Sequence, residues 1–197
     1  MLGDFDACMA AAKEGNEGAF VELFRSVQPA LLRYLTTLGG GLAEDVASET
    51  WVSVVRSLHK FSGDEKGWRS WVFTIAHSRL RDAQRSAVRA PVPVDTDDYL
   101  SSRPSTLDVA VEVEEMFSTE AALALIGTLP PDQAEVVLLR HVAGLEVAHV
   151  AKIVGKQPGT VRVSVHRGLK RLAHLLAERE AEATRQRCND YDASVGN

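Results

Sequence analysis

The clearest chemistry in this sequence lies between Gly144 and Leu172, where positive charges accumulate on an amphipathic pattern. From residue 156 to residue 171 there are five basic side chains and no acidic one: Lys156, Arg162, Arg167, Lys170 and Arg171. Cations at this density suit contact with nucleic-acid phosphates, and an arginine beside a groove can form two parallel hydrogen bonds with guanine. An alternative without a binding function stays open, because a basic amphipathic helix can also simply expose its charged face to solvent.

The pattern around these cations indicates a helix-turn-helix motif. Helical spacing of apolar residues predicts helices over 147–154 and from Pro158 to about Leu176, separated by a turn that contains Gly155. The second helix of such a motif can lie in the major groove of DNA. At about 100° per residue, its apolar and polar residues fall on separate faces. The predicted buried face holds Val161, Val165, Leu169 and Leu172. The residues predicted to contact DNA are Thr160, Arg162, Val163, His166, Arg167 and Lys170.

The rest of the chain must position this motif, and its patterns also predict helices. Apolar residues recur at three- and four-residue steps over residues 18–38, 42–58 and 68–85, and a further helix is expected over residues 132–142 after a double proline. Three consecutive glycines, residues 39–41, end the first of these helices. We therefore expect an all-α fold with two small helical domains, the C-terminal one a helix-turn-helix, joined by a flexible acidic linker.

The charge distribution supports this division of the chain. The formal net charge is −5, which by itself argues against nucleic-acid binding. However, residues 86–117 carry two cations against seven carboxylates, whereas residues 118–176 carry seven cations against four carboxylates. We predict an N-terminal helical domain over 1–85, an acidic proline-containing linker over 86–117, a basic C-terminal domain over 118–176 and a disordered tail over 177–197. The later half of the linker, from Thr106 to Phe117, could be the start of a helix.

Several classes of function are disfavoured by the residue pattern. The six histidines are scattered, and no Ser/His/Asp spacing or phosphate-cradling glycine loop after a strand is present, so we do not expect an enzyme or a cofactor. Cys8 and Cys188 lie near opposite ends and suggest neither a disulfide framework nor a metal site. The sequence has no apolar run of about 18 residues and no signal-peptide pattern. We therefore expect a cytoplasmic protein that does not insert into a membrane.

A second candidate surface lies on the helix expected over residues 42–58. Asp45, Ser48, Glu49 and Val52 follow one another at three- and four-residue spacing and therefore share one stripe. Two carboxylates and a hydroxyl along a stripe can meet a partner protein. An acidic solvated face is an equally good interpretation of this pattern taken alone.

The C-terminal motifs resemble those of extracytoplasmic-function sigma factors of the sigma-70 superfamily. The matching runs are Leu129-Pro-Pro, Val137-Leu-Leu-Arg140, Gly144-Leu145, Val150-Ala-Lys-Ile-Val-Gly155 and Gly159-Thr-Val-Arg162. The resemblance implies that this domain binds the minus-35 promoter element as duplex DNA. Many members follow Gly-Thr-Val with a basic residue, Ser and Arg, whereas this chain keeps Arg162 but continues with Val163 and Ser164. Glu146 stands where the family usually has a Ser or Thr helix cap.

The N-terminal motifs resemble the same family. One run, Ala43-Glu-Asp-Val-Ala-Ser-Glu-Thr-Trp51, is similar to a signature of the family, with Ser48 in place of the usual Gln. In the family, this signature lies on a helix that clamps a coiled coil of the largest polymerase subunit. The resemblance therefore implies polymerase contacts at Asp45, Ser48, Glu49 and Val52. A second run, from Trp68 to Arg85, is similar to the segment that, with the loop before it, captures the melted minus-10 element. The contacts implied there are Trp68, Arg69, His77, Ser78, Arg81 and Arg85. His77-Ser78 stands where the family usually has Arg-Asn. Trp71 and Ile75, by contrast, are expected in the core because they are apolar residues at helical spacing.

The resemblance implies a non-enzymatic sigma factor that binds core RNA polymerase and directs promoter-specific transcription initiation. Its implied partners are core RNA polymerase, promoter DNA and an anti-sigma factor, although no residue identifies the last. A stand-alone helix-turn-helix regulator is the main rival interpretation. It predicts a homodimer on a palindromic site, whereas the sigma interpretation predicts a 1:1 complex with polymerase and an asymmetric promoter.

Overall fold

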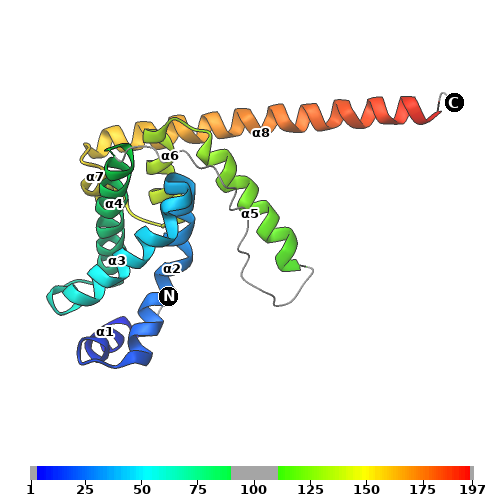
Figure 1. Cartoon of the computed structure of the whole chain (residues 1–197). Helices are drawn as coiled ribbons and strands as arrows, with labels where there is room; N and C mark the ends of the chain where they lie inside the picture. The colour runs from blue at the N-terminus through cyan, green and yellow to red at the C-terminus, as the bar shows by residue number, and fades with distance from the viewer. Residues whose placement is uncertain (1–3, 90–110, 196–197) are drawn as a thin grey trace. The chain divides into compact units, whose positions relative to one another are not determined.

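The structure, a computed structural model, describes residues 4–89 and 111–195, and within these ranges it contains helices and no β-strand (Figure 1). The chain divides into two compact units, residues 1–124 and 125–197. The helices are α1 (Phe5–Lys13), α2 (Glu17–Gly39), η1 (Gly40–Leu42), α3 (Ala43–Ser57), η2 (Leu58–Lys60), α4 (Glu65–Arg89), α5 (Val111–Gly127), α6 (Pro131–Val137), η3 (Leu138–Val142), α7 (Val147–Val154) and α8 (Pro158–Val195). The predicted all-α class is confirmed.

The first unit is built from α2, α3 and α4, which pack against one another around an apolar core. Its largest fully buried side chains are Leu23, Leu31, Tyr34, Leu35, Trp68 and Phe73. The predicted glycine stop lies at the end of α2, where Gly40 has a φ of 52°. Gly39 allows α2 to approach α4 closely, because an added Cβ there would lie 2.9 Å from Leu80 Cδ1.

Helix α1 was not predicted from the sequence. Asp4 caps it, since its Oδ1 accepts a hydrogen bond from the Ala7 amide at 3.1 Å. Phe5, Met9 and Ala12 are buried and stand at four- and three-residue steps. That spacing is the signal that would have predicted the helix.

Helices enter the predicted linker at both of its ends. Helix α4 continues to Arg89, beyond the predicted end at residue 85, and α5 begins at Val111, within the later half where a helix start was left open. Residues 90–110, which hold the three prolines and all four aspartates of the range 86–117, lie outside the described residues.

The second unit contains the helix-turn-helix. The helix predicted over residues 132–142 is α6 followed by the π-helical turn η3, with Pro131 in the first turn of α6. Helix α7 has the predicted bounds, and Gly155 ends it in the left-handed region with a φ of 66°. Both α6 and α7 pack against α8, so the apolar residues of three short segments form one core.

The tail from residue 177 is predicted to be disordered, whereas in the structure α8 continues past Leu176 as a single helix to Val195 (Figure 1). The sequence after residue 176 is rich in alanine, glutamate and arginine, which are strong helix formers. Loss of apolar periodicity therefore marked a helix that lacks a packed face and did not mark the end of the helix.

Gly168 is the point where α8 approaches α6 most closely, and it yields a stability prediction. A Cβ at this buried position would lie 2.8 Å from Val137 Cγ2 and 3.5 Å from Leu129 Cδ1. Gly168→Leu is expected to lower the free energy of unfolding of the second unit by about 2 kcal/mol, because overpacking a filled core forces side chains and backbone apart. Thermal and urea unfolding of the full chain, followed by circular dichroism, measure the change.

Gly159→Leu is the matched control for Gly168→Leu. Gly159 lies in the same helix, and an added Cβ there meets no atom within 4 Å. Equal unfolding midpoints for the two variants would contradict the close approach at Gly168.

Candidate nucleic-acid interface

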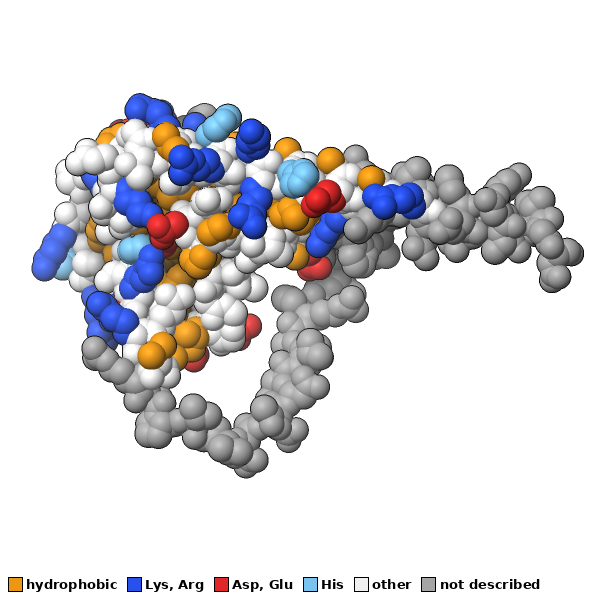
Figure 2. Space-filling model, turned by 90° about the horizontal axis from the view of Figure 1, so that it is seen from above, with side chains coloured by type: hydrophobic (Ala, Val, Ile, Leu, Met, Phe, Trp, Pro, Cys, Tyr) orange, Lys and Arg blue, Asp and Glu red, His pale blue; other side chains and the backbone are white. Residues whose placement is uncertain are grey.

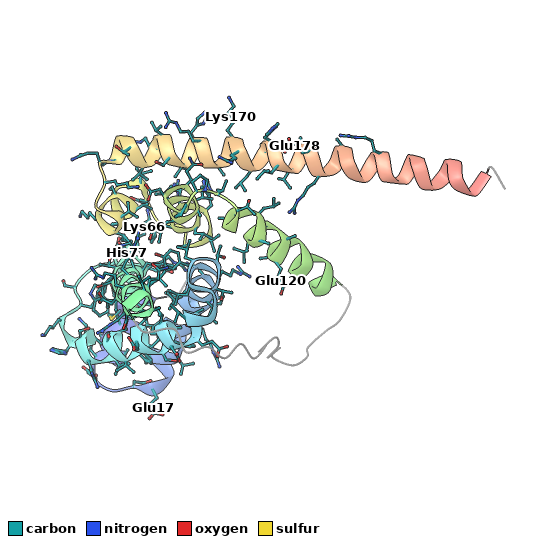
Figure 3. All side chains as sticks on the ribbon, turned by 45° about the horizontal axis from the view of Figure 1, so that its top comes forward. Glu17, Lys66, His77, Glu120, Lys170 and Glu178 are labelled. Carbon is teal, nitrogen blue, oxygen red and sulfur yellow. The ribbon has the colours of Figure 1, made fainter. Side chains whose placement is uncertain are left out.

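The first part of α8 presents the predicted DNA-reading residues on its surface. Figure 2 shows Lys and Arg side chains gathered over this stretch, and Figure 3 shows Lys170 projecting away from the helix. All six predicted residues, Thr160, Arg162, Val163, His166, Arg167 and Lys170, are exposed. Val163 is 48% exposed even though it is apolar, and this exposure fits a contact with a thymine methyl group.

The buried face of α8 differs from the prediction at one position. Val161 is fully buried, and Val165 and Leu172 are half-buried, but Leu169 is 40% exposed. At 100° per residue Leu169 lies at the edge of the apolar face, whereas Gly168 lies near its centre. The close contact with α6 is therefore made by Gly168, and Leu169 borders the exposed surface.

The turn of the motif is fixed from both sides. The amide of Lys156 donates to the carbonyl of Ala151 at 3.0 Å, which closes the end of α7. The Lys156 Nζ donates to Asp132 Oδ2 at 2.6 Å, which joins the turn to the start of α6. Lys156 thus has a structural partner within the unit. The other four of the five basic residues lie on the exposed surface of α8: Arg162, Arg167, Lys170 and Arg171.

In the first unit, α4 exposes part of the predicted minus-10 surface. Ser78, Arg81 and Arg85 are exposed and lie at three- and four-residue steps on one face. Arg85 is paired with Asp82 one turn away. The exposed face of α4 can therefore offer guanidinium groups and a hydroxyl to a strand of nucleic acid.

Trp68 contradicts the prediction that it stacks on a base. Its side chain is 0% exposed and contacts Phe61, Trp51 and Trp71 inside the core. Helical spacing indicates this burial, because Trp68 lies three and four residues before Trp71 and Val72. The aromatic residues that cover it come from α3, from α4 itself and from the loop before α4. The Trp68 ring is part of the core and does not form part of the exposed surface.

Arg69 and His77 are half-buried and are both engaged within the protein. Arg69 Nη2 donates to the carbonyl of Ser26 at 2.7 Å, which joins α4 to α2. His77 Nδ1 lies 3.5 Å from the Tyr34 hydroxyl. Neither contact could be predicted from the sequence, since each partner is 43 residues away in the chain.

Trp71 is a candidate contact that the sequence analysis placed in the core. It is half-buried, and its ring centroid lies 5.2 Å from that of Phe61. Seven-residue steps bring Trp71, Ser78 and Arg85 onto one face of α4. A partly exposed aromatic ring next to basic residues can stack on single-stranded bases.

The predicted polymerase-binding stripe lies entirely on the surface of α3. Asp45, Ser48 and Glu49 are exposed, and Val52 is 48% exposed. Asp45 and Glu49 also line a shallow groove of about 520 Å³ between α3 and α4, together with Asp82. The stripe thus combines a concentration of carboxylates with an apolar residue at its end.

The potential metal ligands of the described residues do not form a cluster. Among them, no group of three or more histidine, cysteine or carboxylate side chains is placed to hold a metal ion. Burial raises the pKa of the Cys8 thiol and the nearby Glu22 carboxylate raises it further, so this thiol is not activated. None of the helices in residues 4–89 and 111–195 has the length and apolar content that a membrane span requires.

Comparison with known proteins gives two family matches that together cover most of the chain. Residues 23–90 match Sigma-70 region 2 and residues 119–172 match Sigma-70, region 4. The ECF RNA polymerase sigma factor ShbA of Streptomyces griseus is 34% identical over 182 residues, which covers 86% of this chain and 93% of that protein. The two units of the structure thus correspond to the two matched regions.

Two solved structures share the fold at lower identity. CnrH in complex with the cytosolic domain of CnrY matches with a TM-score of 0.60 and 22% identity, over 89% of this chain and 99% of that one. The sigma factor RpoE from Bartonella quintana, in complex with the anti-sigma factor NepR, matches with a TM-score of 0.57 and 22% identity, over 80% and 96%. The two family matches and the 34% identity to ShbA establish that the chain belongs to the ECF sigma factors, non-enzymatic subunits that direct RNA polymerase to promoters.

Proposed function

We propose that the two units divide promoter recognition between them. The exposed face of α8 reads the minus-35 element as duplex through Thr160, Arg162, Val163, His166, Arg167 and Lys170. The exposed face of α4 holds the melted minus-10 element through Ser78, Arg81 and Arg85, with Trp71 beside them. The stripe on α3, formed by Asp45, Ser48, Glu49 and Val52, binds core RNA polymerase.

The observation that carries this proposal is the separation of faces on α8. Val161 and Gly168 fix one side of the helix against α6 and α7, and this leaves Arg167 and Lys170 directed to solvent. A recognition helix held in this way can enter a major groove without rearrangement of its own core. The exposed cations supply phosphate contacts, while the exposed valine and arginine side chains can contact base edges.

A single small unit of this kind binds DNA weakly, and the proposal explains how a promoter is nevertheless selected. When polymerase holds both units, binding of the second promoter element becomes effectively intramolecular. The α3 stripe is therefore as necessary to promoter recognition as the α8 face. This coupling also predicts that the free chain has low affinity for promoter DNA.

We further propose a cytoplasmic location and control by an anti-sigma factor. The location is supported by the need to meet polymerase. The second partner is supported by the relative from Bartonella quintana, which was solved in complex with an anti-sigma factor. Such a partner would compete with polymerase if it covered the stripe on α3.

The experiment that tests the proposed function is reconstitution with core RNA polymerase followed by mapping of transcription starts. The expected result is a 1:1 complex of chain and core enzyme and a set of asymmetric promoters that share two elements. A homodimer that binds palindromic DNA without polymerase would contradict the proposal and would favour a stand-alone regulator.

A further inference from the structure

The loop before α4 is fixed by contacts to neighbouring helices, although three of its four residues are exposed. We call residues 61–64 the 61–64 loop. Ser62, Gly63 and Asp64 are exposed, whereas the ring of Phe61 is buried with 7% of its surface accessible. Asp64 Oδ1 accepts from the Gly67 amide at 2.8 Å and so fixes the end of the loop at the start of α4.

Phe61 anchors the loop in an aromatic cluster. Its ring centroid lies 5.6 Å from that of Trp68 and 5.2 Å from that of Trp71, both on α4. Gly63 lies over the same ring with a φ of 155°, and a Cβ there would be 3.3 Å from Phe61 Cζ. The position of the Phe61 ring therefore constrains the backbone of the loop.

Helix α1 holds this anchor from the other side. Lys13, the last residue of α1, donates from Nζ to the carbonyl oxygen of Phe61 at 2.6 Å. Phe5, in the first turn of α1, meets the Phe61 ring edge to face, with centroids 6.5 Å apart. Both contacts bridge about 50 residues of sequence, and α1 lies outside the matched region 2, which begins at residue 23.

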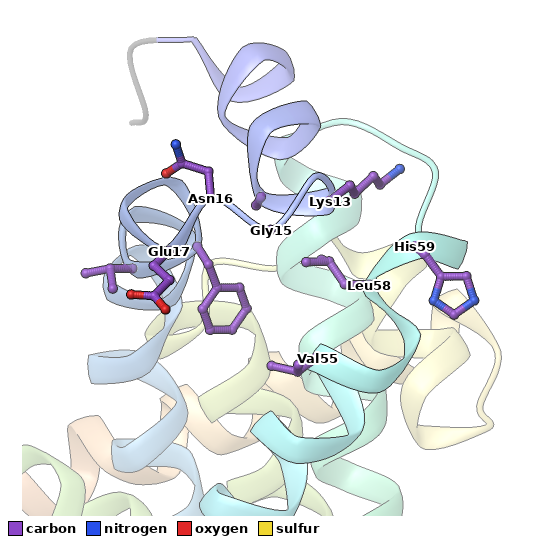
Figure 4. Close-up of a pocket in the computed structure, with 10 residues that line it drawn as sticks. Lys13, Gly15, Asn16, Glu17, Val55, Leu58 and His59 are labelled. Carbon is purple, nitrogen blue, oxygen red and sulfur yellow. The ribbon is translucent and has the colours of Figure 1, made fainter.

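Lys13 is one of the residues that line a neighbouring pocket, but its ammonium group is hydrogen-bonded to the loop. A pocket of about 570 Å³ lies where the turn between α1 and α2 meets the end of α3, with Phe20, Val55 and Leu58 among its lining residues. Figure 4 shows Lys13 at the rim of this pocket, and its Nζ bonds the carbonyl of Phe61. The ammonium group of Lys13 is thus hydrogen-bonded to the loop.

We propose that α1 is a brace that sets the conformation of the 61–64 loop, with Lys13 as a positioning residue for selection of the minus-10 base. This inference rests on the proposed function, in which the exposed face of α4 meets the melted strand, and it assigns the loop before α4 to the same surface, as the family resemblance implies. A loop that is held in one conformation presents the same backbone groups to every base, so the fit of the base decides affinity. A loop released from α1 adapts to several bases and loses discrimination.

The test uses Lys13→Met, which keeps the aliphatic stem and removes the donor, and Lys13→Arg, which keeps a donor and the charge. Lys60→Met is the matched control, because it removes one exposed charge beside the loop. Each full-length variant is bound to core polymerase and transcribes a promoter and its single-base minus-10 variants. The readout is the ratio of transcript yields between the best base and the others.

The expected result is a fall of this ratio by about tenfold for Lys13→Met, since a hydrogen bond to a charged group is worth about that factor in an equilibrium constant. Lys13→Arg should restore most of the ratio, and Lys60→Met should leave it unchanged, because phosphate contacts carry no sequence information. A Lys13→Met ratio equal to wild type, or an equal loss of yield on all promoters, would overturn the brace. A wild-type chain that shows no minus-10 preference would instead overturn the proposed function, and the brace with it.

Discussion

Arg167→Ala combined with Lys170→Ala is expected to lower promoter-specific transcription by about ten- to a hundredfold, while binding to core polymerase stays at the wild-type level. Both side chains are exposed on the face of α8 that is directed away from α6 and α7. Removing a side chain that meets a base edge costs roughly 1–3 kcal/mol of binding free energy, and removing one that meets a phosphate costs less. Abortive and run-off transcription at several salt concentrations measures the loss.

The control for this double substitution is Arg179→Ala combined with Arg185→Ala. These two arginines are exposed on the same helix and carry the same charge, but they lie beyond residue 172, where the region 4 match ends. A nonspecific electrostatic effect of α8 would weaken both double variants alike. Reduced salt dependence in the Arg167/Lys170 variant alone would locate the phosphate contacts on the recognition face. Loss of polymerase binding together with promoter recognition would contradict the division between the two units.

The residues of the α8 surface could be predicted because the signal is local. Within one helix, the spacing of Val161, Val165 and Leu172 determines which side is buried, and the exposed face follows from geometry. The one misassigned residue of the predicted apolar face, Leu169, lies at the boundary of that face, where the direction of a side chain alone does not determine its exposure. The contact of Gly168 with α6 decides it, and that contact joins two helices.

The minus-10 surface was harder to predict because its contacts join distant segments. Trp68 follows the apolar spacing of α4, which is a local sign of burial, and Phe61 and Trp51 from other segments complete the cover of its ring. Arg69 is held by the carbonyl of Ser26, a backbone group that no side-chain pattern marks. Helical periodicity therefore predicted α4 but did not determine which of its polar residues remain available.

The two ends of the described chain show the limits of periodicity in opposite ways. Helix α1 has a periodic apolar face that was overlooked, because only nine residues carry it. The end of α8 has no such face, and yet it is helical to Val195, because intrinsic propensity can maintain a helix that is already nucleated. Absence of an apolar stripe is therefore weak evidence for disorder when it follows a strong helix.

Glu49→Lys is expected to weaken binding of the chain to core RNA polymerase by about tenfold or more, because a like-charge contact at an interface costs on the order of 1 kcal/mol or above. Glu49 is exposed on the α3 stripe and lines the groove between α3 and α4 beside Asp45 and Asp82. Replacing it reverses the charge at the centre of this carboxylate group. Titration of labelled chain with core enzyme measures the dissociation constant.

Glu44→Lys makes the same change of charge on the same helix and separates the stripe from the overall charge of α3. Glu44 is exposed but lies about 100° around the helix from Asp45. We expect it to leave the dissociation constant within about twofold of wild type, since exposed charges away from an interface contribute little. If both variants bind equally weakly, the polymerase recognises the net charge of α3 and not the stripe. If only Glu49→Lys is weakened, adding Asp45→Lys should weaken binding further, because the two carboxylates are one turn apart and face the same partner.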